Sequence, residues 1–179
     1  MNQSVQTVLD TIALEDGANR YDKDFDFKRS QHLITQAEWP LFKQAFQVVS
    51  DAVQKTIDER KYGKKLPWPE ILKEVGADNV AYIVLQVGFY HALERKPTTT
   101  AAAAAGRLIA AQTKEKIKLD YKDLVTLGFQ AGMCGMECGL FQITTLEGED
   151  YQILEFTEDA VQKMHELKAV SYTHLTLPT

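Results

Sequence analysis

The spacing of apolar positions along the chain predicts a series of α-helices. Over 40–60 an apolar residue recurs every three or four positions, so a helix there would carry a single hydrophobic face. That face consists of Phe42, Ala45, Phe46, Val49, Val53 and Ile57. The same spacing predicts a first helix over 4–15 and a short one over 69–75, after a break at Gly63.

The segment 78–93 is expected to form the central helix of the core. Asp78 fits the N-cap position, and the residues after it leave almost no polar side. Three threonines at 98–100 can cap a further helix over 101–117, whose first five residues are alanine and would let a neighbour approach closely. An apolar stripe over 124–134 continues the helical pattern, although glycines at 128, 132, 135 and 139 crowd it.

The pattern changes to a period of two near the C-terminal end. Residues 140–144 and 151–156 alternate as strands do, and the acidic, glycine-containing stretch between them predicts a β-hairpin. Thr157 can cap a last helix through Lys168, with Val161, Met164 and Leu167 facing inward. The expected fold is therefore mainly α, a helical bundle-like domain with one β-hairpin near its C-terminal end.

The last ten residues, 170–179, fit none of this organisation. They resemble a translated sequencing-adapter read, of the kind that ends fragmentary assembled genes. We therefore expect one domain over 1–169 and a non-native tail over 170–179.

Composition places the chain among soluble globular proteins. Of the 179 residues, 45% are hydrophobic and 25% charged, and no window is long and apolar enough for a membrane span. The start carries no secretory signal, and the two cysteines, Cys134 and Cys138, lie four apart in a helical pattern that does not suit a disulfide. We expect a cytoplasmic protein without a membrane partner.

The charge is unevenly distributed. The formal net charge is −5, yet four of the six residues in 60–65 are cationic, namely Arg60, Lys61, Lys64 and Lys65. Flexible cations on a short loop between rigid helices can enter the minor groove of A·T-rich DNA, and Tyr62 with Gly63 would allow close approach. The same run is also typical of a solvated helix end.

Catalytic chemistry has little support in the sequence. There is no nucleotide-binding glycine loop and no pair of metal-ligand clusters, so we predict neither catalytic residues nor a metal or other cofactor in this chain. Cys134 and Cys138 are interpreted as small core residues. The acids at 147–150 are interpreted as a solvated turn.

Several segments, taken in order, resemble the amino-terminal domain of single-subunit RNA polymerases of the bacteriophage and mitochondrial type. The most specific match is the run Asn79, Val80, Ala81, Tyr82, Ile83 and Val84. An alanine-rich helix over 98–112, containing Gly106 and Arg107, follows it as in that family. The resemblance extends, with gaps, over most of 4–168.

This resemblance implies two DNA contacts. The stretch 59–67 corresponds to the family's A·T-rich recognition loop, which assigns Arg60, Lys61, Tyr62, Lys64 and Lys65 to upstream promoter DNA. The stretch 140–156 corresponds to an intercalating hairpin that separates the strands, which assigns DNA melting to Thr144, Thr145 and Leu146. Two features depart from the family: a much shorter connection at 119–123, and an acidic hairpin tip.

The resemblance also implies what the parent protein does. It would be a DNA-directed RNA polymerase, a nucleotidyltransferase, whose catalytic domain and Mg²⁺ would lie beyond Leu167. Its partners would be double-stranded promoter DNA, the rest of the polymerase chain and, as a further candidate, nascent RNA.

Two other functions remain open at this point. A free-standing transcription regulator of the winged-helix type would also place helices before a hairpin, but 122–139 offers glycine, methionine and cysteine in place of the polar residues of a recognition helix. The other alternative is a structural helical protein in which the loop 60–65 is only solvated, and such a protein would not bind DNA.

Overall fold

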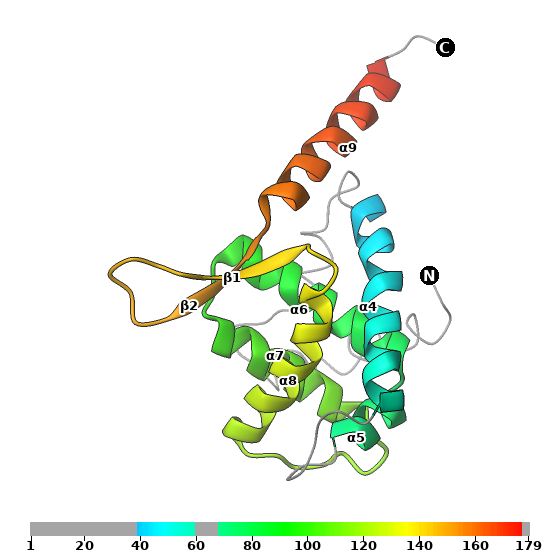
Figure 1. The fold of residues 1–179 in the computed structure, drawn as a ribbon, viewed down its shortest axis with the longest axis vertical. Coiled ribbons are helices and arrows are strands. Elements are labelled where there is room, and N and C mark those ends of the chain that lie inside the picture. Colours follow the sequence, from blue (N-terminus) through cyan, green and yellow to red (C-terminus); the bar gives the residue numbers. More distant parts are fainter. Residues whose placement is uncertain (1–38, 60–67, 177–179) are drawn as a thin grey trace.

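The computed structural model describes residues 39–59 and 68–176, and in this part the protein is mainly helical with one antiparallel hairpin near the C-terminal end (Figure 1). The helices are α4 (Trp39–Glu59), α5 (Trp68–Val75), α6 (Ala77–Glu94), α7 (Thr98–Ala111), α8 (Tyr121–Met136) and α9 (Glu158–Thr176). The strands are β1 (Phe141–Thr145) and β2 (Gln152–Phe156). The predicted fold class is confirmed, whereas the predicted helix over 4–15 lies outside the described residues.

Helix α6 lies at the centre of the core, as its sequence predicts. Every residue from Val80 to Ala92 is buried, and α4, α5, α7, α8 and β2 all pack against this helix. The ring of Tyr82 meets that of Phe42 edge to face with centroids 5.6 Å apart. Burial raises the pKa of Tyr82 to about 12, so its phenol stays neutral at any physiological pH.

The start of α6 differs from the prediction that Asp78 is its N-cap. Gly76 occupies that position with φ +94°, a conformation that side chains rarely adopt, and the helix begins at Ala77. Asp78 lies in the first turn, where its carboxylate accepts a hydrogen bond of 2.6 Å from the Ser50 hydroxyl. It therefore joins α6 to α4.

Helices α7 and α8 pack backbone against backbone. A methyl group on Gly106 would overlap the carbonyl oxygen of Leu124, and one on Gly128 would overlap that of Ala102. The close approach expected from the alanines is thus confirmed, and two of the glycines in this helix pair serve the contact.

Two boundaries of α7 were predicted wrongly. The helix begins at Thr98, so Thr98 lies in the first turn and Pro97 is the N-cap. It ends at Ala111 and not near residue 117. The buried hydroxyl of Thr113 donates to the Ala110 carbonyl at 2.7 Å and accepts from the Ile117 N–H at 3.2 Å, which turns the chain away from the helix.

Helix α9 follows the hairpin and projects away from the body (Figure 1). Thr157 caps it as predicted, because its hydroxyl accepts a hydrogen bond of 3.2 Å from the Ala160 N–H. Met164 and Leu167 are half-buried, but Val161 is exposed, so its predicted inward orientation is wrong. The helix continues past Lys168 into the segment 170–179 that we expected to lie outside the domain.

No helix within the described ranges is long and apolar enough to cross a membrane.

Candidate nucleic-acid interface

The predicted DNA-binding loop residues Arg60, Lys61, Tyr62, Lys64 and Lys65 lie outside the described residues. The structure does describe the two helices that flank them. Helix α4 ends at Glu59 after the buried Ile57, and α5 begins at the buried Trp68. These two helices pack against each other, so both flanks of the loop are fixed to the core.

The root of the hairpin is held by three phenylalanine rings. Phe141 of β1 pairs with Phe156 of β2, and their rings stack with centroids 5.5 Å apart. Both rings also meet the buried Phe89 of α6, at centroid distances of 5.7 and 5.5 Å. Aromatic contacts of this kind stabilise beyond the area they bury, so the hairpin root is rigidly joined to the central helix.

A second set of contacts joins β2 to the start of α7. Ile153 is fully buried and forms a bridge with Pro97. The Thr98 hydroxyl donates a hydrogen bond of 3.2 Å to the Gln152 carbonyl. The hairpin is therefore held at two places, while its loop extends from the body (Figure 1).

Two of the three residues assigned to DNA melting are bound within the hairpin itself. The Thr144 hydroxyl donates a hydrogen bond of 2.6 Å to the Glu155 carboxylate. The same carboxylate accepts a hydrogen bond of 3.0 Å from the Gln142 amide. These two bonds hold the pKa of Glu155 below its usual value. The Thr145 hydroxyl accepts a hydrogen bond of 3.3 Å from the Gln152 amide. Both threonines therefore link the two strands of the hairpin.

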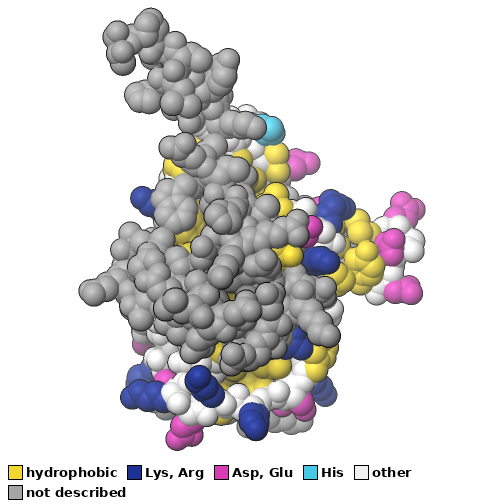
Figure 2. Space-filling view, turned by 180° about the vertical axis from the view of Figure 1, so that it is seen from behind, with side chains coloured by type: hydrophobic (Ala, Val, Ile, Leu, Met, Phe, Trp, Pro, Cys, Tyr) yellow, Lys and Arg dark blue, Asp and Glu magenta, His cyan; other side chains and the backbone are white. Residues whose placement is uncertain are grey.

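The tip of the hairpin combines apolar and acidic side chains. Leu146 is half-buried, and its carbonyl accepts a hydrogen bond of 3.2 Å from the Glu149 N–H across the turn. Glu147, Glu149 and Asp150 are exposed to solvent. Figure 2 shows hydrophobic side chains along the projecting hairpin and acidic ones at its end.

Tyr151 is a tip residue that the sequence pattern misplaced. Its period-two spacing with Ile153 assigned it to the strand, but β2 begins at Gln152. Tyr151 lies at the end of the loop, directly before β2, with 39% of its surface exposed. The signal that could have identified it is an aromatic residue directly after the turn acids.

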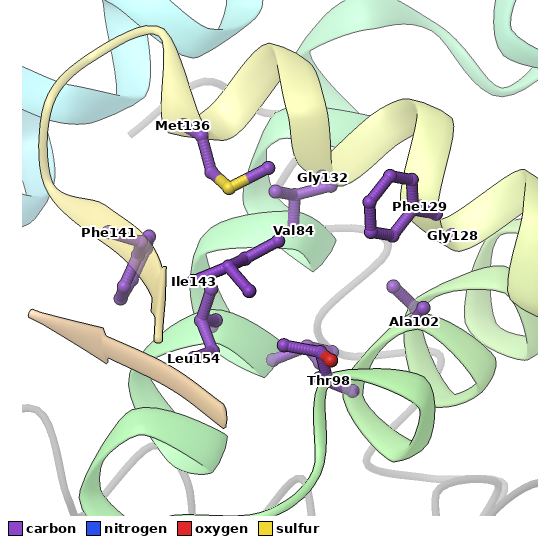
Figure 3. A pocket seen from close by; sticks show the side chains of 14 residues that line it. Val84, Thr98, Ala102, Gly128, Phe129, Gly132, Met136, Phe141, Ile143 and Leu154 are labelled. Carbon is purple, nitrogen blue, oxygen red and sulfur yellow. The ribbon is translucent and has the colours of Figure 1, made fainter. Parts of the chain in front are cut away.

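A small apolar cavity is enclosed by the hairpin and by helices α6, α7 and α8 (Figure 3). Its volume is about 60 Å³. Figure 3 shows Phe129, Gly132 and Met136 of α8 facing Ile143 and Leu154 of the hairpin. A lining of this kind offers contact with methyl or ring groups and no acid–base chemistry.

The part of the chain that the structure describes contains no group of three or more His, Cys, Asp or Glu side chains placed to hold a metal ion. The interpretation of the acids at 147–150 as a solvated turn agrees with their exposure.

The two cysteines are free thiols, of which Cys134 is buried in α8 and Cys138 is half-buried just after that helix ends. The Cys134 sulfur lies 3.4 Å from the Thr56 hydroxyl, and the Cys138 thiol donates 2.8 Å to the Gly135 carbonyl. Burial raises the pKa of both thiols above the ordinary value. Their interpretation as packed structural residues fits this environment.

We therefore expect both cysteines to react slowly with iodoacetamide in the folded protein at neutral pH, because the thiolate is the reactive form. The rate should rise to that of an ordinary thiol when urea unfolds the chain. Mass spectrometry of timed samples measures both rates, and equal rates in the two states would contradict the burial of these sulfurs.

Comparison of the chain with protein-family models, with curated proteins and with solved structures finds no match.

Proposed function

We propose that this chain is the amino-terminal promoter-binding region of a single-subunit DNA-directed RNA polymerase of the bacteriophage and mitochondrial type. The loop 60–65 would contact upstream A·T-rich DNA through the minor groove, and the hairpin β1–β2 would hold the upstream edge of the bubble open. Nucleotidyl transfer and its Mg²⁺ would belong to the polymerase's catalytic domain.

The observation that supports this proposal most is the projecting hairpin with a fixed root. A device that separates strands must resist the return of the displaced bases, so it needs a stiff support and a free end. The three-ring root and the hydrogen bond from Thr98 supply the support. The exposed loop between Leu146 and Tyr151 supplies the free end.

The tip chemistry favours contact with bases over contact with phosphates. Glu147, Glu149 and Asp150 repel the DNA backbone, whereas Leu146 and Tyr151 can cover an exposed base pair. Stacking of a base on an aromatic ring contributes about 1–3 kcal/mol. That gain offsets part of the few kcal/mol needed to unstack one base step.

A winged-helix regulator is less well supported by the same geometry. Its recognition helix would be α8, directly before the hairpin, yet the large exposed side chains in the middle of α8 are Phe129 and Met133. Neither can hydrogen-bond to a base edge. Helix α8 is moreover packed tightly on α7 through Gly128.

The proposal is tested by strand opening with a promoter duplex that carries 2-aminopurine at the upstream bubble edge. The wild-type chain should raise its fluorescence, because the probe brightens when it unstacks. Tyr151→Ala combined with Leu146→Ala should remove most of that rise while leaving duplex affinity within about threefold, since the loop cations supply most of the affinity.

Val48→Ala is the matched control, because Val48 is also an exposed apolar side chain but lies on α4. It should leave the fluorescence rise unchanged. A rise that survives the double substitution, or that the control removes equally, would contradict the role of the hairpin.

A further inference from the structure

The connection between α7 and α8 carries a second cluster of cations that the proposed duplex contacts do not use. Within 112–122 there are four lysines, Lys114, Lys116, Lys118 and Lys122, against two acids, Glu115 and Asp120. We call the segment 112–120 the lysine linker. All four lysine side chains are exposed, and Figure 2 shows several Lys and Arg side chains, with Asp and Glu side chains between them, at the end of the molecule opposite α9.

The lysine linker is held in one conformation. Thr113 is buried and anchors the segment. Its carbonyl accepts a hydrogen bond of 3.1 Å from the Lys116 N–H, and its hydroxyl accepts one from the Ile117 N–H. The backbone N–H of Lys114 donates a hydrogen bond of 2.5 Å to the Glu74 carboxylate of α5. Lys116 has φ +44°, a conformation that persists in a non-glycine residue only where its surroundings determine it.

Alternation along the linker directs its side chains to two sides. Ile117 and Leu119 are half-buried and pack against the core, while Lys118 between them is exposed. The cations are thus presented by a fixed backbone, so less conformational freedom is lost when they bind a ligand.

The nearby acids are partly engaged by backbone N–H groups. Asp120 is the N-cap of α8, and its carboxylate accepts 2.8 Å from the Asp123 N–H. The Glu74 carboxylate is engaged in the same way by the Lys114 N–H. Glu115 is also exposed, so the outward side of 112–122 carries both signs of charge, with four lysines against two acids.

An aromatic ring completes this surface. Tyr121 directly follows the linker and is 55% exposed. The Arg107 guanidinium lies over the ring, 5.6 Å from its centroid, which holds the ring in place. Cations along an extended path beside an accessible aromatic ring are the combination that binds single-stranded nucleic acid.

We infer that the lysine linker and Tyr121 form a binding site for a single nucleic-acid strand, with the lysines on phosphates and Tyr121 stacked on an unpaired base. An anionic membrane surface fits less well, because the linker's own apolar residues, Ile117 and Leu119, face inward and cannot insert into lipid. Its residues are distinct from those of the loop 60–65 and of the hairpin, and the inference does not depend on the function proposed for them.

The test is fluorescence anisotropy of the full chain with labelled oligothymidine and oligouridine fifteen-mers. Lys114→Ala, Lys116→Ala and Lys118→Ala together should weaken binding at least tenfold and lower the salt slope by about 2 units, at about 0.7 for each phosphate contact. Tyr121→Ala should weaken it about tenfold, while Tyr121→Phe should bind as the wild type does because it keeps the ring.

Lys43→Ala, Lys55→Ala and Lys163→Ala together form the matched control, since these lysines are also exposed but lie on α4 and α9. This control should bind within about twofold of the wild type. The inference is overturned if the wild type retains neither oligonucleotide at low salt, or if the two triple variants lose affinity equally.

A third arm uses vesicles of phosphatidylcholine and phosphatidylserine. Sedimentation of the wild type with these vesicles, together with no oligonucleotide binding, would overturn the inference in favour of a membrane surface. A preference for oligouridine over oligothymidine would support RNA as the natural strand, and the reverse preference would support DNA. The duplex measurements above are unaffected by any of these outcomes.

Discussion

Replacing Gly128 by alanine should lower the free energy of unfolding by about 3 kcal/mol or more, the upper range for overpacking a close contact. The added methyl would overlap the carbonyl oxygen of Ala102, which is backbone and cannot rotate away. Helices α7 and α8 would have to separate, and the contacts around Gly106 would open with them. Urea denaturation followed by circular dichroism measures the effect.

Gly132→Ala is the control for this substitution. Gly132 lies one turn further along α8, and a methyl there would meet nothing within 4 Å. Since alanine favours a helix over glycine by about 0.5–1 kcal/mol, this variant should be slightly more stable than the wild type. Equal losses of stability in the two variants would contradict the close α7–α8 contact.

The second large effect concerns the loop 60–65. Lys61→Ala, Lys64→Ala and Lys65→Ala together should reduce the salt slope of duplex binding by about 2.7, since each lysine that neutralises a phosphate adds about 0.9 to that slope. Affinity for an A·T-rich duplex should fall by more than tenfold at low salt. A titration over several salt concentrations measures both quantities.

The same three-lysine control on α4 and α9 separates a local effect from a change in net charge. Removing Lys43, Lys55 and Lys163 lowers the charge by the same amount and should leave the slope nearly unchanged. If both triple variants lose affinity equally, the loop has no special role.

Periodicity predicted the elements well where the core decides the structure. The continuous apolar content of 80–92 identified the central helix, and the change from a period near four to a period of two identified the hairpin. Those patterns follow directly from which side chains are buried.

Boundaries were predicted less well because single hydrogen bonds and backbone angles set them. The alanine-rich helix stops at Ala111 because Thr113 takes over the hydrogen bonds of the next turn. Asp78 does not cap α6 because Gly76 supplies the required backbone angle and Ser50 offers the carboxylate another partner. Val161 is exposed because α9 projects from the body.

The candidate interface was predictable in outline only. The sequence placed the hairpin, but Thr144 and Thr145 brace it, and Tyr151 lies in the loop and not in the strand that its spacing predicts. The lysine linker was not predicted, because the helical pattern continues into it. The apolar pattern predicts a helix through residue 117, and lysines are common at the end of a helix. The sequence therefore does not indicate that these lysines lie on a fixed, exposed segment beside Tyr121.

The proposed function requires that this chain binds promoter-like DNA and favours its opened form. The most direct measurement is an equilibrium titration of the wild-type chain at low salt with an A·T-rich duplex and with the same duplex carrying a short premelted bubble beside it. We predict binding to both, tighter to the bubble by at least about fivefold, because strand separation no longer opposes contact by Leu146 and Tyr151. Retention of neither DNA would contradict the proposed function, and equal affinity for the two would contradict the role of the hairpin.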